Sequence, residues 1–355
     1  MAPLISIVID NYNYARFLTQ SIDSALAQSY ANKEVIVVDD ASSDSSADII
    51  ARYGDRVQAI LQESNRGQGA AFNAGFSASR GDIVLFLDSD DWLYPHALQR
   101  VADEWQKGAC KTHFRLDLVD VDGEHIDVHP PPEVRLDHGD VVPLLLATGR
   151  YVTPVTTGNA FARAALHAVM PIPEKSYRIC ADGYLVTVIP FYGPVITLDE
   201  RLGAYRLHGN NHFSTAGTGQ GISALTQRLR RGLLHDMDKL ASLKATAEAT
   251  GRTLVGEPWQ RDPAHLEARL ASIRLDPAGH PFRHDRTFSV AVKGVRSRRY
   301  SGFARKRQWT MAAWFIVVAV VPQSLAIAAI MWRFVPKSRS VKVDRWLKWL
   351  RRRLR

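Results

Sequence analysis

Short apolar runs alternate with amphipathic stretches through the N-terminal part of the chain. The runs cover residues 4–9, 34–38, 57–61 and 83–87. Runs of this length with few polar interruptions are typical of strands buried on both faces of a parallel sheet. After the first run, Phe17, Leu18 and Ile22 recur at helical spacing, and similar stretches follow the other runs. This β-α-β-α order predicts an α/β fold with a Rossmann-like, mostly parallel sheet sandwiched by helices.

Acidic residues follow two of the predicted strands. They are Asp39 and Asp40 after the second strand, and Asp88, Asp90 and Asp91 after the fourth. The carboxyl ends of parallel strands lie at one edge of a sheet, where open α/β sheets bind their ligands. Carboxylates this close repel one another unless a cation or hydrogen bonds compensate, and their hard oxygens suit Mg²⁺ or Mn²⁺. The pattern predicts a metal and phosphate site at this edge, with two independent solvated acidic turns as the alternative.

The pattern becomes less regular after residue 110. Alternating apolar residues over 112–119 predict an added strand, and residues 141–147 and 160–169 favour short helices. Further along, apolar residues at spacings of three and four predict an amphipathic helix over 222–240. Asp262-Pro263 is a plausible cap and first-turn proline for the next helix.

Four motifs lie along the first half of the chain. They read Ser6-Ile7-Val8-Ile9-x-Asn11-Tyr12-Asn13, Glu34-Val35-Ile36-Val37-Val38-Asp39-Asp40-Ala41-Ser42-x-Asp44, Asn65-x-Gly67-x-x-x-Ala71-x-Asn73-x-Gly75 and Gly81-Asp82-x-x-x-Phe86-Leu87-Asp88-x-Asp90-Asp91. In this order and spacing they resemble the family 2 glycosyltransferases, which have the GT-A nucleotide-sugar fold. The resemblance covers roughly residues 4–212. It implies an enzyme that moves a sugar from a UDP-, GDP- or dTDP-linked donor to an acceptor hydroxyl.

The resemblance implies nucleotide-sugar-binding roles for five residues of these motifs. Tyr12 looks like the residue that stacks on the nucleotide base, and Asp40 like the acceptor of the base's imide hydrogen. Asp88 and Asp90 belong to a DxD-type site that holds the ribose and the diphosphate metal. Asn73 lies in the same loop region, where we expect it to tie the loop together rather than contact the sugar.

The resemblance also implies a metal site and a catalytic base. Asp90, Asp91 and His208 are the expected ligands of Mn²⁺ or Mg²⁺, although His208 is equally well explained as a structural histidine. Asp182 lies where the family keeps its base; many members have Glu-Asp there, whereas this chain has Ala181-Asp182. A single base facing a metal-bound diphosphate implies in-line displacement with inversion, unlike the two-carboxylate glycosidase arrangement.

Other function classes fit the sequence less well. A dinucleotide-binding oxidoreductase would carry Gly-x-Gly-x-x-Gly after the first strand, where this chain has residues 10–13, Asp-Asn-Tyr-Asn. A nucleotidyltransferase would have a glycine-rich basic loop at the same place. No Gln-x-x-Arg-Trp signature of processive synthases lies beyond Asp182, which favours addition of a single sugar. A non-catalytic, nucleotide-sugar-binding membrane scaffold stays open as the alternative.

Charge is unevenly distributed along the 355 residues, whose net charge is +9. The segment 293–307 is strongly basic, 308–332 carries no charge, and 333–355 is basic again with Asp344 as its only acid. This pattern favours an anionic membrane surface as partner and argues against nucleic acid, which would not explain the uncharged stretch. Cys110 and Cys180 are too few for a disulfide framework, which fits a reducing compartment.

The predicted organisation is a catalytic domain with a membrane-associated helical extension. The expected parts are a GT-A domain over 1–214, a helical extension over 215–307, a hydrophobic membrane segment over 308–335 and a basic amphipathic tail over 336–355. Pro322 interrupts the hydrophobic segment, so we expect a re-entrant helical hairpin or a strongly kinked in-plane segment, with a single-pass helix as the alternative. We further expect the protein to lie at the cytoplasmic face of the inner membrane. We expect it to use a lipid-linked acceptor in envelope polysaccharide or glycolipid assembly.

Overall fold

The structure is a computed structural model that describes residues 2–208, 221–301 and 303–335. The chain forms two compact units, of which the first comprises Met1–Leu207 and Asp238–Gly256 and the second His208–Met237 and Glu257–Arg355. The predicted boundary between residues 214 and 215 and the predicted basic tail over 336–355 lie outside the described residues.

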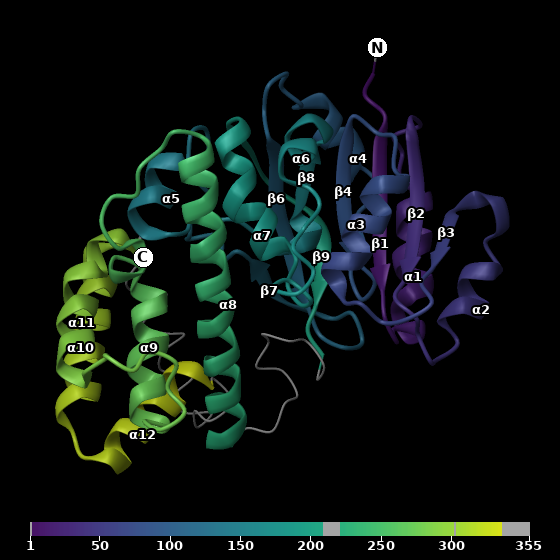
Figure 1. Cartoon of the computed structure of the whole chain (residues 1–355). Helices are drawn as coiled ribbons and strands as arrows, with labels where there is room; N and C mark the ends of the chain where they lie inside the picture. Colours follow the sequence, from purple (N-terminus) through teal and green to yellow (C-terminus); the bar gives the residue numbers. More distant parts are fainter. Residues whose placement is uncertain (1, 209–220, 302, 336–355) are drawn as a thin grey trace. The chain divides into compact units, whose positions relative to one another are not determined.

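The first unit is built on one mixed sheet (Figure 1). Within the described residues the strand order is β3-β2-β1-β4-β8-β6-β9-β5, and β7 pairs with β6. The strands are β1 (Ile5–Asn11), β2 (Lys33–Asp39), β3 (Gln58–Leu61), β4 (Ile83–Asp88), β5 (Trp92–Leu93), β6 (Lys111–Val119), β7 (His125–His129), β8 (Asn159–Ala162) and β9 (Val195–Arg206). The four predicted N-terminal strands and the added strand near 112–119 are confirmed.

Strand direction changes across the sheet. β1 runs parallel to β2 and β4, and β2 runs parallel to β3, as predicted. Beyond β4, however, β8 is antiparallel to both β4 and β6. β5 is antiparallel to β9 and β7 is antiparallel to β6, whereas β6 and β9 run parallel to each other. The prediction of a mostly parallel sheet therefore holds for the first four strands and for the pair of β6 and β9, and it is wrong where β5, β7 and β8 pair. The short connection between β6 and β7 makes a hairpin, which joins antiparallel neighbours directly.

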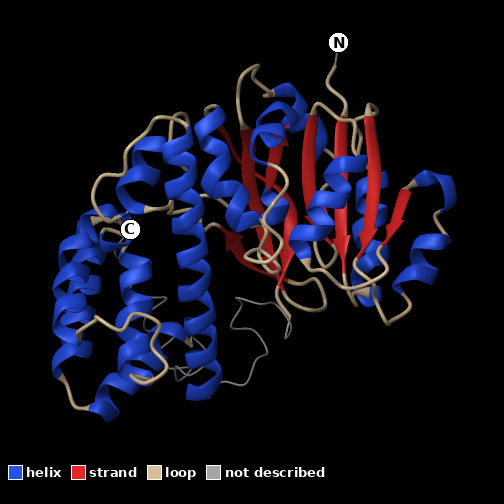
Figure 2. Cartoon of the chain, viewed as in Figure 1, coloured by secondary structure: helices blue, strands red, loops and turns tan. Residues whose placement is uncertain are grey.

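Helices cover both faces of the sheet, as predicted (Figure 2). Successive strand residues point to opposite faces, so Ile7 and Leu85 pack in one core and Val8 and Phe86 in the other. The first face packs on α1 (Ala15–Leu26), α2 (Ser46–Ala51) and α4 (Ala97–Asp103). The second packs on α3 (Gln68–Ala78), α5 (Val142–Thr148), α6 (Arg163–Val169) and α7 (Asp182–Val188).

Two segments of the first unit differ from prediction. The helix expected over 160–169 begins only at Arg163, because residues 159–162 form β8 between β4 and β6. This short apolar segment fits a helix or a strand equally well, and sheet pairing decides. The long strand β9 was not predicted, since Asp199, Glu200 and Arg201 interrupt its apolar pattern where its register with β6 shifts.

The second unit is helical. Its helices are α9 (Pro263–Leu275), α10 (Thr287–Ser297), α11 (Arg305–Val320), α12 (Gln323–Phe334) and the first part of α8 (Ile222–Ala249). Asp262 caps α9 as predicted, because its Oδ1 accepts a 2.9 Å hydrogen bond from Ala264 N and Pro263 occupies the first turn. Leu225, Leu266 and Phe315 lie in the shared core.

The uncharged stretch forms two helices rather than one. α11 ends at Val320 and Pro322 caps α12, so the break lies where the sequence predicts it. Within the described residues, no helix is sufficiently long and apolar to span a membrane.

Candidate active site

Three carboxylates meet at the carboxyl end of β4. Asp88 is the last residue of β4, and Asp90 and Asp91 lie in the turn to β5. One oxygen of each lies within 4.8 Å of the others. Burial and the charges of neighbouring aspartates raise the pKa of Asp88 and Asp91 well above the ordinary value. A set of hard, mutually repelling oxygens fits a divalent cation such as Mg²⁺ or Mn²⁺.

Asp91 is fixed by two hydrogen bonds. Thr157 Oγ1 donates to Asp91 Oδ2 at 2.6 Å, and Arg206 N donates to Asp91 Oδ1 at 2.9 Å. The guanidinium of Arg206 also donates to the carbonyl oxygen of Asp90 at 3.0 Å. These bonds join the turn after β4 to the end of β9 and to the short 3₁₀ turn of residues 156–158 before β8. The acidic turn is therefore held by hydrogen bonds from two other parts of the chain.

Asp10 is a fourth carboxylate at this edge, and the sequence analysis missed it. It lies in β1 directly opposite Asp88 of β4. Burial is the largest cause that raises the pKa of Asp10 to about 7, with the charge of Asp90 adding to it. Asp10 Oδ1 is buried without a hydrogen-bond partner. The signal was present, because Asp10, like Asp39, directly follows the core of an apolar run.

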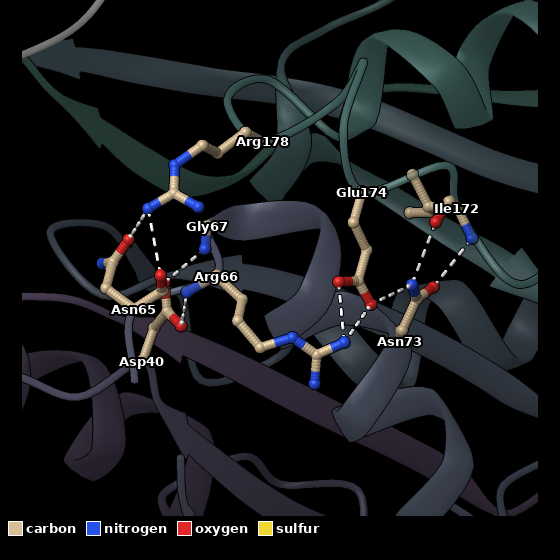
Figure 3. Close-up of polar contacts among 8 residues, drawn as sticks. All are labelled: Asp40, Asn65, Arg66, Gly67, Asn73, Ile172, Glu174 and Arg178. Carbon is tan, nitrogen blue, oxygen red and sulfur yellow. Dashed lines mark hydrogen bonds and ion pairs between the residues drawn. The ribbon is translucent and has the colours of Figure 1, made fainter. Parts of the chain in front are cut away.

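Asp40 directly follows β2 and holds the loop that precedes α3 (Figure 3). Its Oδ1 accepts a hydrogen bond from Arg66 N at 2.7 Å, and its Oδ2 accepts one from Gly67 N at 2.6 Å. Tyr12 lies just after β1 with 45% of its surface exposed, as a stacking platform requires. The nucleotide-binding roles of Tyr12 and Asp40 stay predictions.

Asn73 joins α3 to the segment near residue 172 (Figure 3). Its Nδ2 donates to Ile172 O at 3.0 Å, and its Oδ1 accepts from Ile172 N at 2.8 Å. Glu174 contacts both Asn73 Nδ2 at 3.3 Å and Arg66 Nη2 at 2.7 Å. These contacts agree with the expected loop-holding function of Asn73, whereas contact with a sugar stays a prediction.

Asp182 is the first residue of α7. Burial raises the pKa of its carboxyl group, partly offset by the charges of Lys239 and Lys111. The charge of Asp182 in turn contributes to the raised pKa of Asp88. Gln68 donates a hydrogen bond to Asp88 Oδ1 and accepts one from the N–H of Ala181, the residue before Asp182. The start of α7 is thus linked to the carboxyl end of β4, and the roles of Asp182 as base and of Asp90 and Asp91 as metal ligands stay predictions.

The loop that precedes Asp182 is docked on the first turn of α3. Gln68 N donates to Arg178 O at 2.8 Å, and Gly69 N donates to Tyr177 O at 3.1 Å. A Cβ atom on Gly67 would lie 2.3 Å from Arg178 O, and one on Gly69 would lie 2.6 Å from Tyr177 O. Glycine at both positions is therefore required by the close approach of two backbones, and at Gly67 also by its φ of 88°.

His208 lies two residues beyond β9 and is buried. It belongs to the second unit, whereas the acidic turn belongs to the first. Its role as a metal ligand stays a prediction.

The sequence of the chain is similar to those of known proteins. The model of the glycosyl transferase family 2 matches residues 6–124. An uncharacterized glycosyltransferase of Nostoc sp. is 41% identical over 219 residues, which span 60% of this chain and 67% of that protein. The succinoglycan biosynthesis protein ExoO of Rhizobium meliloti is 38% identical over 134 residues, 37% of this chain and 38% of that protein.

The comparison with solved structures finds similarity at low sequence identity. The mannosyltransferase PcManGT of Pyrobaculum calidifontis, in complex with GDP-Man and Mn²⁺, is 16% identical with a TM-score of 0.48, covering 91% of this chain and 88% of that chain. The family assignment depends instead on the matched motifs and on the Nostoc relative, of which this chain covers two thirds. The chain belongs to the glycosyl transferase family 2.

Proposed function

We propose that this glycosyltransferase transfers one sugar from a nucleoside diphosphate donor to an acceptor hydroxyl, with metal dependence and with inversion at the anomeric carbon. The observation that carries the proposal is the cluster of Asp88, Asp90 and Asp91 at the end of β4, which Gln68 links by hydrogen bonds to Ala181, the residue before Asp182. Glycosyl transfer requires stabilisation of the leaving group and removal of a proton from the acceptor. The three acids of the turn after β4 would serve the first task and Asp182 the second.

The acidic turn would hold a divalent cation and the donor diphosphate. Asp88, Asp90 and Asp91 would hold the cation, with His208 as a further predicted ligand. A bound Mg²⁺ or Mn²⁺ would offset the charge that develops on the leaving diphosphate. Thr157 and Arg206 hold the carboxylate of Asp91 by hydrogen bonds. The entropic cost of ordering this side chain when the cation binds should therefore be small.

Asp182 would act as the general base. Its carboxylate takes the proton of the acceptor hydroxyl while the acceptor oxygen forms a bond to the anomeric carbon. The bond from that carbon to the diphosphate oxygen breaks, and the nucleoside diphosphate leaves. Burial raises the pKa of Asp182, which makes it a stronger base than an exposed aspartate.

A donor screen tests the proposal. The full chain is incubated with UDP-, GDP- and dTDP-sugars in Mn²⁺ or Mg²⁺, and released nucleoside diphosphate is measured alongside donor binding. We expect one nucleotide class to be hydrolysed slowly in a metal-dependent manner. Tight donor binding without release, also in the presence of candidate acceptors, would instead support the non-catalytic scaffold.

The acceptor is proposed from a relative. The Rhizobium protein is described as a succinoglycan biosynthesis protein. By analogy, we propose envelope polysaccharide or glycolipid assembly for this chain, with a lipid-linked acceptor at the cytoplasmic face of the inner membrane. Radiolabelled donor tested against a membrane lipid extract would detect transfer to such an acceptor, and label that stays wholly water-soluble would contradict it.

The second unit carries a surface suited to that location. Trp309, Ile316, Val317 and Val320 lie along one side of α11 and are all exposed. We call these four residues the α11 stripe. The adjoining first turn of α11 consists of exposed Arg305, Lys306 and Arg307. An apolar stripe beside a cationic end complements an anionic bilayer interface, in which α11 would lie in the plane of the membrane.

Vesicle flotation tests the membrane proposal. We expect the full chain to float with phosphatidylglycerol-containing vesicles, and the pair Ile316→Ser and Val320→Ser to weaken this at least threefold. The matched control is Leu234→Ser with Met237→Ser, which removes two exposed apolar residues from α8, each 44% exposed against 52% and 66% for Ile316 and Val320. Equal flotation of the two double variants would show that the α11 stripe does not bind the membrane. If the chain instead forms dimers without vesicles, and only the Ile316→Ser, Val320→Ser variant loses them, the α11 stripe binds a second copy of the chain.

A further inference from the structure

The side chain of Gln68 bridges two parts of the site. Its Nε2 donates to Asp88 Oδ1 at 3.0 Å and to Asp10 Oδ2 at 3.3 Å. Its Oε1 accepts a hydrogen bond from Ala181 N at 2.9 Å. Ala181 directly precedes Asp182 at the start of α7. One amide group therefore contacts the end of β4, the end of β1 and the residue before the predicted base.

The chemistry of this contact is specific to an amide. The carboxylates of Asp88 and Asp10 only accept hydrogen bonds when ionised, and Ala181 N only donates. A glutamine satisfies both demands at once, because its two N–H groups face the acids and its carbonyl oxygen faces the backbone N–H. Glutamate would keep the second contact and place negative charge against the acids, and methionine would lose both contacts at nearly the same length.

The surrounding backbone holds the segment 178–181 at a defined distance from the first turn of α3. Gln68 N is itself bonded to Arg178 O, so the first turn of α3 holds both ends of the segment 178–181. Cys180, inside that segment, has a φ of 59°, a conformation that a non-glycine residue adopts at some cost. The bond from Gln68 to Ala181 lies directly after this residue and helps to hold the conformation.

We infer that Gln68 is a positioning residue, which sets the distance and orientation between the donor-side carboxylate Asp88 and the start of the helix that carries Asp182. The inference depends on the proposed function for its catalytic consequence, but its structural part stands alone. General-base catalysis requires the carboxylate within hydrogen-bond reach of the attacking hydroxyl, and a displacement of about 1 Å can cost 10²-fold in rate. Gln68 would act through Asp182 and Asp88 without touching the reacting atoms.

Gln28 provides a matched control. It is a buried glutamine whose Nε2 donates to Tyr94 O at 2.8 Å and to Ser24 O at 3.0 Å, and whose Oε1 accepts from Leu98 N at 3.0 Å. It thus makes the same number of hydrogen bonds as Gln68, but it joins α1 to α4, which carry none of the predicted site residues. Gln28→Met and Gln68→Met should both reduce thermal stability for the same physical reason.

The experiment compares Gln68→Met and Gln28→Met by hydrogen exchange and by kinetics on the full chain. In Gln68→Met, we expect the amide of Ala181 to exchange at least tenfold faster, measured on peptides covering 177–185. With the donor identified by the screen, kcat should fall at least tenfold while the donor KM changes less than threefold. Gln28→Met should alter neither the exchange of this segment nor the ratio of kcat to KM.

Gln68→Glu separates the two halves of the bridge and serves if Gln68→Met fails to fold. Its Oε1 still accepts from Ala181 N, so exchange of that amide should stay slow while kcat falls and the Mn²⁺ concentration for half-maximal activity shifts. Unchanged exchange at Ala181 in Gln68→Met, or wild-type kcat in both Gln68 variants, would overturn the inference. If the wild-type protein turns over no donor, the proposed function fails, and the exchange result still decides whether Gln68 holds the loop.

Discussion

Thr157 Oγ1 donates a 2.6 Å hydrogen bond to Asp91 Oδ2, and both residues are buried. The bond fixes the turn after β4 against the segment that enters β8, although the two residues are far apart in the sequence. Because Asp91 is a predicted metal ligand, the contact links the mixed half of the sheet to the proposed metal site. It is one of the features that no sequence motif indicates.

Removal of this hydroxyl should weaken both the fold and the metal site. Thr157→Val keeps the shape but leaves a buried carboxylate oxygen without its donor, at a cost of about 1 to 3 kcal/mol of unfolding free energy. We expect a matching loss of unfolding free energy in urea. We also expect the Mn²⁺ concentration for half-maximal activity to rise several-fold. Thr157→Ser keeps the hydroxyl and should stay close to wild type; equal defects in both variants would assign the effect to packing.

Asp90 should be required for transfer. In Asp90→Asn the acidic turn loses one charged oxygen ligand, so we expect activity to fall by about 10² or more, the scale of a lost electrostatic group at a reacting centre. EDTA should abolish wild-type activity, with recovery on addition of Mn²⁺ or Mg²⁺. Asp55→Asn, a change at an exposed acid remote from β4, is the control. Full activity of the wild type in EDTA would contradict the metal assignment.

Lys111 should give the protein an unusual dependence of stability on pH. It is fully buried in β6, where its Nζ donates to Asn159 Oδ1 at 2.6 Å and Thr153 Oγ1 at 2.7 Å. Burial lowers the pKa of Lys111 from 10.5 to about 7. Between these values the unfolded chain binds more protons than the folded one, so the contribution of Lys111 to stability rises with pH across this window.

Urea unfolding of wild type and Lys111→Met at two pH values measures this contribution. Lys111→Met removes the titration, so wild type should gain stability relative to the variant by roughly 2 to 3 kcal/mol between pH 7 and pH 9. Below pH 7 the difference should level off, because the lysine is then protonated in both states. A difference between the two proteins that does not change from pH 7 to pH 9 would show that Lys111 keeps an ordinary pKa.

The sequence predicts the N-terminal half of the fold well, for a physical reason. β1, β2 and β4 are buried on both faces, so their residues are almost all apolar and the acids at their ends stand out. β9 is not predictable in the same way, because it carries Asp199 and Glu200 where its register shifts. Its place beside β6 depends on tertiary pairing rather than on local pattern.

The residues of the site likewise differ in how far the sequence predicts them. Asp88, Asp90 and Asp91 are neighbours in sequence, so a local motif reveals them. Gln68 and Ala181 are far apart, and their hydrogen bond exists only because the segment after Tyr177 docks on α3. The glycines of the third motif are visible in the sequence, but the close backbone approach that requires them is a property of the folded chain.

Asp182 provides the most direct test of the central claim, that the carboxylates at this edge catalyse sugar transfer. Asp182→Asn removes the base but keeps size and polarity, so donor binding measured by calorimetry in Mn²⁺ should stay within about threefold of wild type, while turnover of bound donor should fall by about 10² or more. Turnover equal to that of wild type, or a collapse of donor binding with unchanged turnover of the donor that does bind, would contradict the account.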